Sequence, residues 1–246
     1  IDPKEFTEYI IEALKIEKDW IPKENGKSLY IRPMIVATDE CLGVHASKTY
    51  QFVCMFCPVA SYYKNGIEPV KIYVEHDYKR AVKGGTGFAK TAANYAQSLR
   101  SQEEAELAGY AQVLWLDAIE RKYIEEVGSM NVMFKINGEV ITPKLTGSVL
   151  PGITRKSAIE FLTSKGYKVT ERLISAEEVV DAVKNGTLEE AWGTGTAAVV
   201  SPIGVLHYEG VDYKINNNEI GEVCHTLYEG LTGIQWGRTE DTFGWT

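Results

Sequence analysis

The sequence has no long apolar run, no excess of basic residues and few cysteines. Apolar stretches such as VLWL at 113–116 and AAVV at 197–200 are far too short to cross a bilayer. No secretory hydrophobic region opens the chain. Lysine and arginine number 26 against 34 acidic residues, which gives a net charge of −8. Because a nucleic-acid site needs a basic stripe, which we do not find, we expect no binding to nucleic acid. The short apolar stretches likewise predict no membrane binding.

Only four cysteines are present, and two of them have the spacing Cys54-x-x-Cys57. Metal and redox sites use this spacing, but QFVCMFCPV is typical of a strand, where a three-residue step puts the two thiols on opposite faces. No second Cys/His pair has ligand spacing. We therefore predict no metal site, and reduced cysteines buried in a strand, which suit a cytoplasmic protein.

The residues that are abundant predict a globular chain. Hydrophobic residues make up 44% of the 246 positions and aromatics 11%, which is ample for a core. A helix is predicted from residue 3, with Asp2 as N-cap, Pro3 at the first helical position and Glu5 as capping partner. The tract SYYKNGIEP at 61–69 carries the Asn-Gly and Pro of a connector. We predict a small domain over 1–60, the connector at 61–69 and a large domain over 70–246.

Hydrophobic periodicity predicts a mixed α/β chain with helices and strands in alternation. An Asn137-Gly138 pair closes one predicted hairpin. Helices are predicted at 3–18, 91–109, 154–165, 176–185 and 219–231, and strands at 28–38, 51–60, 70–74, 111–117, 131–138, 138–145, 167–172, 190–203 and 205–208.

The stretch KGGTGFAKTAANY at 83–95 places three glycines ahead of a lysine. It is not a nucleotide-phosphate loop, because Ala89 occupies the position where that loop needs glycine. A phosphotransferase is therefore disfavoured. Desolvation lowers the pKa of buried lysines and prepares them as Schiff-base nucleophiles, so Lys90 is either such a nucleophile or an exposed helix lysine. Tyr95, five positions on, could hydrogen-bond a ring hydroxyl.

Three further segments carry residues suited to one cofactor. In YIEEVGSMNVMF, Glu125 or Glu126 could pair with the nitrogen of a pyridine ring, although a glutamate pair before a glycine is usually a solvated turn. LPGITR at 150–155 offers backbone N–H groups and a hydroxyl at a helix start, which is a natural phosphate site. GTGTAA at 193–198 offers a threonine between small residues. Taken singly, each segment is an ordinary loop.

Taken together and in order, these motifs identify a resemblance. With SLYIRP, LGV, QVLWLD and IQWGRTED, they make the chain closely similar to the branched-chain amino acid aminotransferases, which are fold type IV pyridoxal-phosphate enzymes, over essentially all 246 residues. The resemblance implies a two-domain α/β (α+β) fold, here lacking the start of the small N-terminal domain. An arginine that holds the cofactor phosphate lies in that start in the family.

The resemblance also implies roles for individual residues. Lys90 would form the internal aldimine with pyridoxal 5′-phosphate, and Glu126 rather than Glu125 would face the pyridine nitrogen. The other residues implied to bind the cofactor are Tyr95, Ile153, Thr154, Thr196 and Arg80. Those implied to bind substrate are Tyr30, Arg32, Tyr62, Ser129 and Ala197.

The implied reaction transfers the amino group of leucine, isoleucine or valine to 2-oxoglutarate, giving 2-oxo acids and glutamate in a cytoplasmic homodimer. The redox Cys-x-x-Cys that the mammalian branch carries after its G-x-G-T-A segment is replaced here by TAAVVSP. The alternatives are another fold type IV enzyme, such as a D-amino acid aminotransferase or an aminodeoxychorismate lyase, and an inactive scaffold. The YIRP and EEVGSMN motifs favour the branched-chain enzyme.

Overall fold

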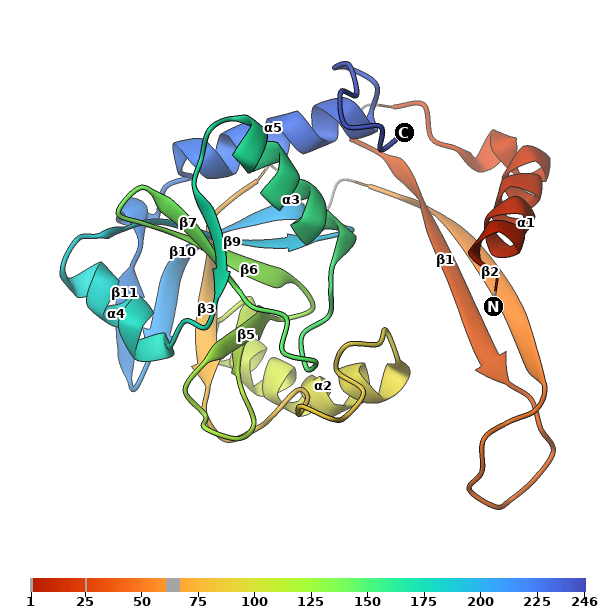
Figure 1. The fold of residues 1–246 in the computed structure, drawn as a ribbon, viewed down its shortest axis with the longest axis horizontal. Coiled ribbons are helices and arrows are strands. Elements are labelled where there is room, and N and C mark those ends of the chain that lie inside the picture. The colour runs from red at the N-terminus through yellow and green to blue at the C-terminus, as the bar shows by residue number, and fades with distance from the viewer. Residues whose placement is uncertain (1, 25, 61–66) are drawn as a thin grey trace. The chain divides into compact units, whose positions relative to one another are not determined.

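The computed structural model describes residues 2–24, 26–60 and 67–246 and divides the chain into two compact units after Gly66 (Figure 1). Most of the predicted connector, 61–66, lies outside the described residues, and so does Tyr62.

The first unit consists of a helix and a two-stranded antiparallel sheet. Its elements are α1 (Pro3–Ile16), a short 3-10 helix (Lys18–Trp20), β1 (Ser28–Ala37) and β2 (Tyr50–Val59). The Asp2 side chain accepts a hydrogen bond from the Lys4 N–H at 2.9 Å, so the predicted N-cap is confirmed. Glu5 does not act as the predicted capping partner in these contacts, because its carboxylate accepts the hydroxyl of Tyr9.

The two cysteines of β2 differ in their exposure. Cys54 pairs with Pro33 across the strands and is half-buried, whereas Cys57 pairs with Tyr30 and is exposed. The prediction that both thiols are buried was therefore wrong, because Cys54 is only half-buried and Cys57 is exposed on a sheet of two strands. No cluster of three or more His, Cys, Asp or Glu side chains suited to a metal occurs in the described part of the chain.

The second unit is built on a nine-stranded mixed sheet. Its order is β5-β4-β3-β10-β9-β6-β7-β8, with β11 paired to β10. The long strand β10 joins the two halves of the sheet, because its first residues pair with β9 and its later ones with β3. The strands are β3 (Val70–Glu75), β4 (Gln112–Leu116), β5 (Ile124–Val127), β6 (Asn131–Ile136), β7 (Glu139–Pro143), β8 (Val169–Arg172), β9 (Leu188–Gly195), β10 (Val199–Tyr208) and β11 (Val211–Lys214).

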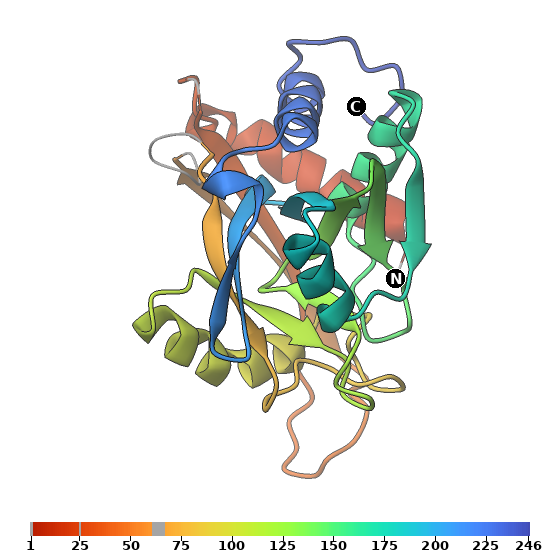
Figure 2. The same cartoon turned by 90° about the vertical axis from the view of Figure 1, so that its left-hand side faces the viewer.

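Four α-helices surround this sheet. Figures 1 and 2 show α3 and α5 near each other at one end of the unit and α2 at the other. The apolar sides of α3 and α5 meet over Phe161, Leu162 and Leu227, which pack with Trp192 of β9 in one buried cluster. The helices are α2 (Ala92–Leu107), α3 (Ile153–Ser164), α4 (Ala176–Lys184) and α5 (Glu222–Gln235), and Asn216–Asn218 form a 3-10 turn.

Two features of the structure that matter for the site were not evident from the local sequence. The predicted single strand 190–203 is two strands, β9 and β10, which pair antiparallel across a turn at 196–198. The glutamate pair is not a solvated turn, because it lies in β5 and both side chains are buried. The Asn137-Gly138 hairpin is confirmed, with φ of 49° and 76° at the two positions. None of the described helices has the length and apolar character needed to span a membrane.

We expect Gly230→Ala to destabilise the second unit. A Cβ at Gly230 of α5 would overlap the ring of Phe161 on α3, and overpacking of this kind costs about 1–3 kcal/mol, more than the gain in helix propensity. The denaturant midpoint should fall, while His225→Ala on the exposed side of α5 should leave it nearly unchanged. Equal midpoints for the two variants would contradict the close packing of α3 on α5.

Candidate active site

A glycine-rich loop leads into α2 and presents Lys90. The Lys90 amine donates to the hydroxyl of Tyr95 at 2.7 Å, and its nitrogen lies 5.0 Å from the centre of that ring. The sequence left open whether Lys90 is buried or exposed, and the structure shows it exposed. Tyr95 lies one turn into α2, so the helix places its phenol beside the amine.

Asn94 fixes this loop from the first turn of α2. Its side-chain amide donates to the backbone oxygens of Thr86 and Ala89, each at 2.8 Å, and its oxygen accepts the Thr86 hydroxyl at 2.8 Å. Asn94 is only 6% exposed. Since Ala89 directly precedes Lys90, these three hydrogen bonds set the position of the lysine backbone.

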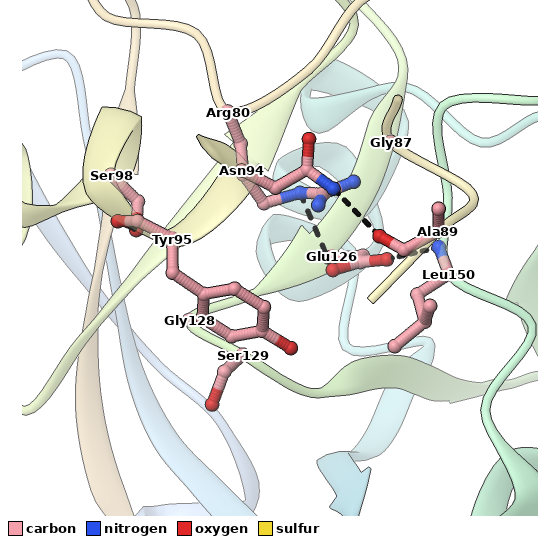
Figure 3. A pocket seen from close by; sticks show the side chains of 10 residues that line it. All are labelled: Arg80, Gly87, Ala89, Asn94, Tyr95, Ser98, Glu126, Gly128, Ser129 and Leu150. Atoms are coloured by element: carbon pink, nitrogen blue, oxygen red, sulfur yellow. Dashed lines mark hydrogen bonds and ion pairs between the residues drawn. The ribbon is translucent and has the colours of Figure 1, made fainter. Parts of the chain in front are cut away.

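Glu126 of β5 is the acid that lines the pocket in Figure 3. Its side chain is 5% exposed, and one oxygen lies 3.3 Å from Nε of the equally buried Arg80. The other oxygen accepts the Leu150 N–H at 2.5 Å. Figure 3 shows both contacts, with Tyr95 and Ser129 on the opposite side of the same pocket.

Burial controls the protonation of this carboxyl. It raises the pKa of Glu126 to about 7, and the neighbouring Glu125 adds to the rise. Arg80, the Leu150 N–H and Lys90 oppose it. A carboxyl balanced near neutral pH can accept a proton or hold a positively charged N–H group, which makes Glu126 suited to a protonated ring nitrogen.

The turn after Glu126 needs glycine. Gly128 has φ of 57°, and a Cβ there would overlap the side-chain amide of Gln112. The turn closes with hydrogen bonds between Val127 and Met130, each 2.9 Å long. It leaves Ser129 exposed at the pocket wall.

The start of α3 is a second candidate binding element. Its N-cap, Gly152, has no capping side chain, so the first backbone N–H groups of the helix, at Ile153 and Thr154, have no side-chain acceptor there. Asn131 packs so closely on Gly152 that a Cβ would overlap its amide oxygen, and it donates to the Leu150 carbonyl at 2.9 Å. Leu150, whose N–H donates to Glu126, therefore also lies directly before this helix.

The turn between β9 and β10 lies at the same edge of the sheet. Asn131 pairs with Thr194 across β6 and β9, which brings the start of α3 and the residues after Thr194 together. Thr196 and Ala197 follow in the turn and are both exposed. The Thr194 hydroxyl is buried and has no hydrogen-bond partner among the described residues.

Two predicted substrate residues belong to the first unit. The Arg32 guanidinium donates to the hydroxyl of Tyr30 at 2.9 Å and lies 5.1 Å from the centre of its ring. Both residues are on β1, two positions apart, and so share one face of the strand. Tyr62 lies outside the described residues.

Comparison with known proteins gives the family. Residues 1–205 match the family described as amino-transferase class IV. The chain belongs to the class IV aminotransferases. It is therefore an enzyme by family, and the resemblance found in the sequence is confirmed.

The similar relatives are branched-chain aminotransferases. The chain is 57% identical to branched-chain-amino-acid aminotransferase 2 of Bacillus subtilis over all of its length and 68% of that protein. It is 53% identical to a probable branched-chain-amino-acid aminotransferase of Staphylococcus aureus, covering 69% of that protein.

Solved structures of the same family share its fold. The branched-chain amino acid aminotransferase of Escherichia coli is 29% identical, with a TM-score of 0.76 over 96% of this chain and 74% of that one. A second branched-chain amino acid aminotransferase, complexed with N-(5′-phosphopyridoxyl)-L-glutamate and solved from the organism abbreviated T.th., is 25% identical, with a TM-score of 0.79 over all of this chain and 74% of that one. The predicted α/β fold is confirmed.

Sequence reasoning did not identify the residues that hold the site together. Asn94, Asn131 and Ser148 are buried and bind backbone or side-chain atoms of the loops that carry the candidate residues. Their signal in the sequence is weak, because a polar residue in or beside a loop is usually solvated. For Asn94 there was a usable hint, since it sits inside the first turn of a helix, where asparagine is disfavoured unless its side chain has a partner.

We expect Asn94→Ala to loosen the loop that carries Lys90. Three hydrogen bonds of about 1 kcal/mol each are lost. Amide hydrogen exchange over 83–91 should therefore accelerate about tenfold to hundredfold. The exposed Gln97→Ala on the same helix is the control and should leave exchange in the loop unchanged. If Asn94→Ala also left it unchanged, Asn94 would not anchor the loop.

Proposed function

We propose that the chain transfers the amino group of branched-chain L-amino acids to 2-oxoglutarate, using pyridoxal 5′-phosphate bound in the second unit. This proposal rests on the buried Glu126, which lines the same pocket as Tyr95. The Tyr95 hydroxyl accepts a hydrogen bond from the Lys90 amine. The names of the similar relatives support the substrate class.

The chemistry of the donors fits pyridoxal phosphate. A buried carboxyl suits a ring N–H, a phenol suits the ring oxygen, and a helix start without a capping side chain suits a phosphate. Glu126, Tyr95 and Arg80 would hold the ring side of the group. The N–H groups and hydroxyl at Ile153 and Thr154, together with the Thr196 hydroxyl, would hold the phosphate.

Each proposed site residue then has a defined role. When bound, the cofactor supplies an aldehyde for the substrate amine and a pyridinium ring that accepts the electrons released at the α-carbon. Lys90 Nζ removes the proton from the substrate α-carbon and returns one in the opposite half-reaction. Tyr95 orients Lys90 through their 2.7 Å hydrogen bond. Glu126 keeps a proton on the ring nitrogen.

The exposed position of Lys90 bears on this proposal. A lysine acts as a base at neutral pH when its charged form is disfavoured, most often by loss of water around it. In the described structure Lys90 is exposed, so its own surroundings do not remove water. We propose that the bound cofactor and substrate, which cover the amine, provide that desolvation.

We propose that Arg32, with Tyr30, binds the substrate carboxylates, because one pocket must accept both an aliphatic side chain and the acid of glutamate. Arg32 is exposed, and among the described residues its guanidinium hydrogen-bonds only to Tyr30. Ser129 and the amide of Ala197, both in exposed turns, are also proposed to contact the substrate. Tyr62 is proposed to contribute from the connector.

We further propose that the chain acts as a homodimer in the cytoplasm. Leu42 and Val44, in the turn between β1 and β2, have fully exposed apolar side chains. In the proposed homodimer a partner subunit would cover these two side chains.

We expect the chain supplied with pyridoxal phosphate to convert L-leucine and 2-oxoglutarate to 4-methyl-2-oxopentanoate and glutamate. Lys90→Ala should lower the rate about 10²–10⁴-fold, because the proton-transfer group is lost. It should also abolish the covalent attachment of the cofactor that borohydride traps and mass spectrometry locates. Lys165→Ala, an exposed lysine at the end of α3, is the matched control and should retain both.

Three results would contradict the proposal. One is a Lys90→Ala variant that retains cofactor attachment at another residue. The second is a preference for D-alanine over L-leucine, which would indicate a D-amino acid aminotransferase. Release of pyruvate from aminodeoxychorismate would indicate the lyase.

A further inference from the structure

Glu125 is a buried acid that the proposed chemistry does not use. It neighbours Glu126 in β5, and since successive side chains of a strand point to opposite faces, it faces away from the pocket of Glu126. It is 6% exposed. One of its oxygens accepts the Ser148 hydroxyl, and the other is buried with no hydrogen-bond partner among the described residues. Burying a carboxyl in this way is costly, so its presence requires an explanation.

Ser148 connects Glu125 to the candidate active site. Its backbone oxygen accepts a hydrogen bond from the Arg80 guanidinium. The same oxygen packs against Gly87 so closely that a Cβ there would overlap it. Two residues later, the Leu150 N–H donates to Glu126. The segment 148–150 therefore contacts Arg80, Glu126 and the loop that leads to Lys90, and Glu125 holds its first side chain.

We propose that Glu125 is a positioning residue, which by binding the Ser148 hydroxyl fixes the segment that holds the Arg80 guanidinium 3.3 Å from the Glu126 carboxylate. This extends the proposed function, since Glu126 is the group assigned to the ring nitrogen. The inference itself concerns the protein without cofactor, so it can be tested whether or not the chain transaminates.

The charges around the two acids give Glu125 two opposite effects. Its own charge raises the pKa of Glu126, whereas Arg80, which it helps to position, lowers that pKa together with Lys90. Burial raises the pKa of Glu125 itself, against its bond from Ser148 and the charge of Arg80. The other charged groups that line the cavity on its side of the strand are Lys83, Asp117, Glu120 and Lys144.

Two substitutions at Glu125 separate these effects. Glu125→Gln removes the charge but keeps an oxygen that can accept the Ser148 hydroxyl. Glu125→Leu has a similar volume but removes both the charge and the acceptor. A residue acting only through its charge would give the same result in both variants, whereas a positioning residue would not.

The experiment is a carbon-13 NMR titration of glutamate carboxyls in the ligand-free chain, with the Glu126 signal assigned by its loss in Glu126→Gln. The wild-type midpoint is expected at about 7. Glu125→Gln should lower it. Glu125→Leu should give a midpoint about one pH unit above that of Glu125→Gln, a tenfold difference in proton affinity, because Arg80 is no longer held. Equal midpoints would overturn the proposal.

Two further variants keep the test decisive. Ser148→Ala retains the charge of Glu125 and removes the Ser148 hydroxyl, with its hydrogen bonds to Glu125 and to the Thr146 hydroxyl. It should raise the Glu126 midpoint above wild type, and an unchanged midpoint would overturn the proposal even if Glu125→Leu does not fold. Glu190→Gln is the matched control, since Glu190 is also 6% exposed and instead accepts the backbone N–H groups that open α5. It should leave the Glu126 midpoint unchanged, and a shift as large as those at Glu125 would contradict a specific role.

Discussion

A carboxyl and a guanidinium are buried together at the candidate active-site pocket of the second unit. Glu126 and Arg80 expose 5% and 7% of their side chains and lie 3.3 Å apart. Removing two such groups from water costs several kcal/mol per ion, which their attraction offsets only with additional hydrogen bonds. The chain supplies those bonds from backbone, through the Leu150 N–H to Glu126 and the Ser148 carbonyl to Arg80. The buried pair thus dictates where the segment 148–150 must run.

The rest of the site follows from that segment. Beyond Leu150 the chain turns through Gly152 into α3, so the helix start proposed for the phosphate is fixed relative to the acid proposed for the ring nitrogen. On the other side, Gly87 packs on Ser148 and thereby sets the loop of Lys90. Asn94 and Asn131 then attach this loop and this helix to α2 and β6. Lys90 lies in a loop, but Asn94, which anchors that loop, belongs to α2, and Asn131, which binds the segment before α3, belongs to β6. Loops attached to regular elements in this way hold a binding site rigidly.

Much of this could be predicted from local sequence. Asp2 and Pro3 predict a helix start, and Asn137-Gly138 predicts a hairpin. The ordered motifs around Lys90 and Glu126 identified a family that the comparisons confirm. What failed depended on long-range packing. By its local sequence the Glu125-Glu126 pair resembles a solvated turn. It is buried because β4 pairs with β5 and because Arg80, 46 positions earlier in the chain, contacts Glu126. The turn between β9 and β10 could not be predicted, because the small residues of GTGTAA at 193–198 favour no single structure. The roles of Asn94, Asn131 and Ser148 depend on partners that no local pattern reveals.

The most direct test of the account is a crystal structure of the chain grown with pyridoxal 5′-phosphate. The account predicts electron density joined to Lys90 Nζ, with the pyridine nitrogen about 2.8 Å from a Glu126 carboxylate oxygen and the phosphate on the first N–H groups of α3. A cofactor joined to a different lysine would contradict it. So would a ring whose nitrogen points to solvent while Glu126 remains paired with Arg80 alone.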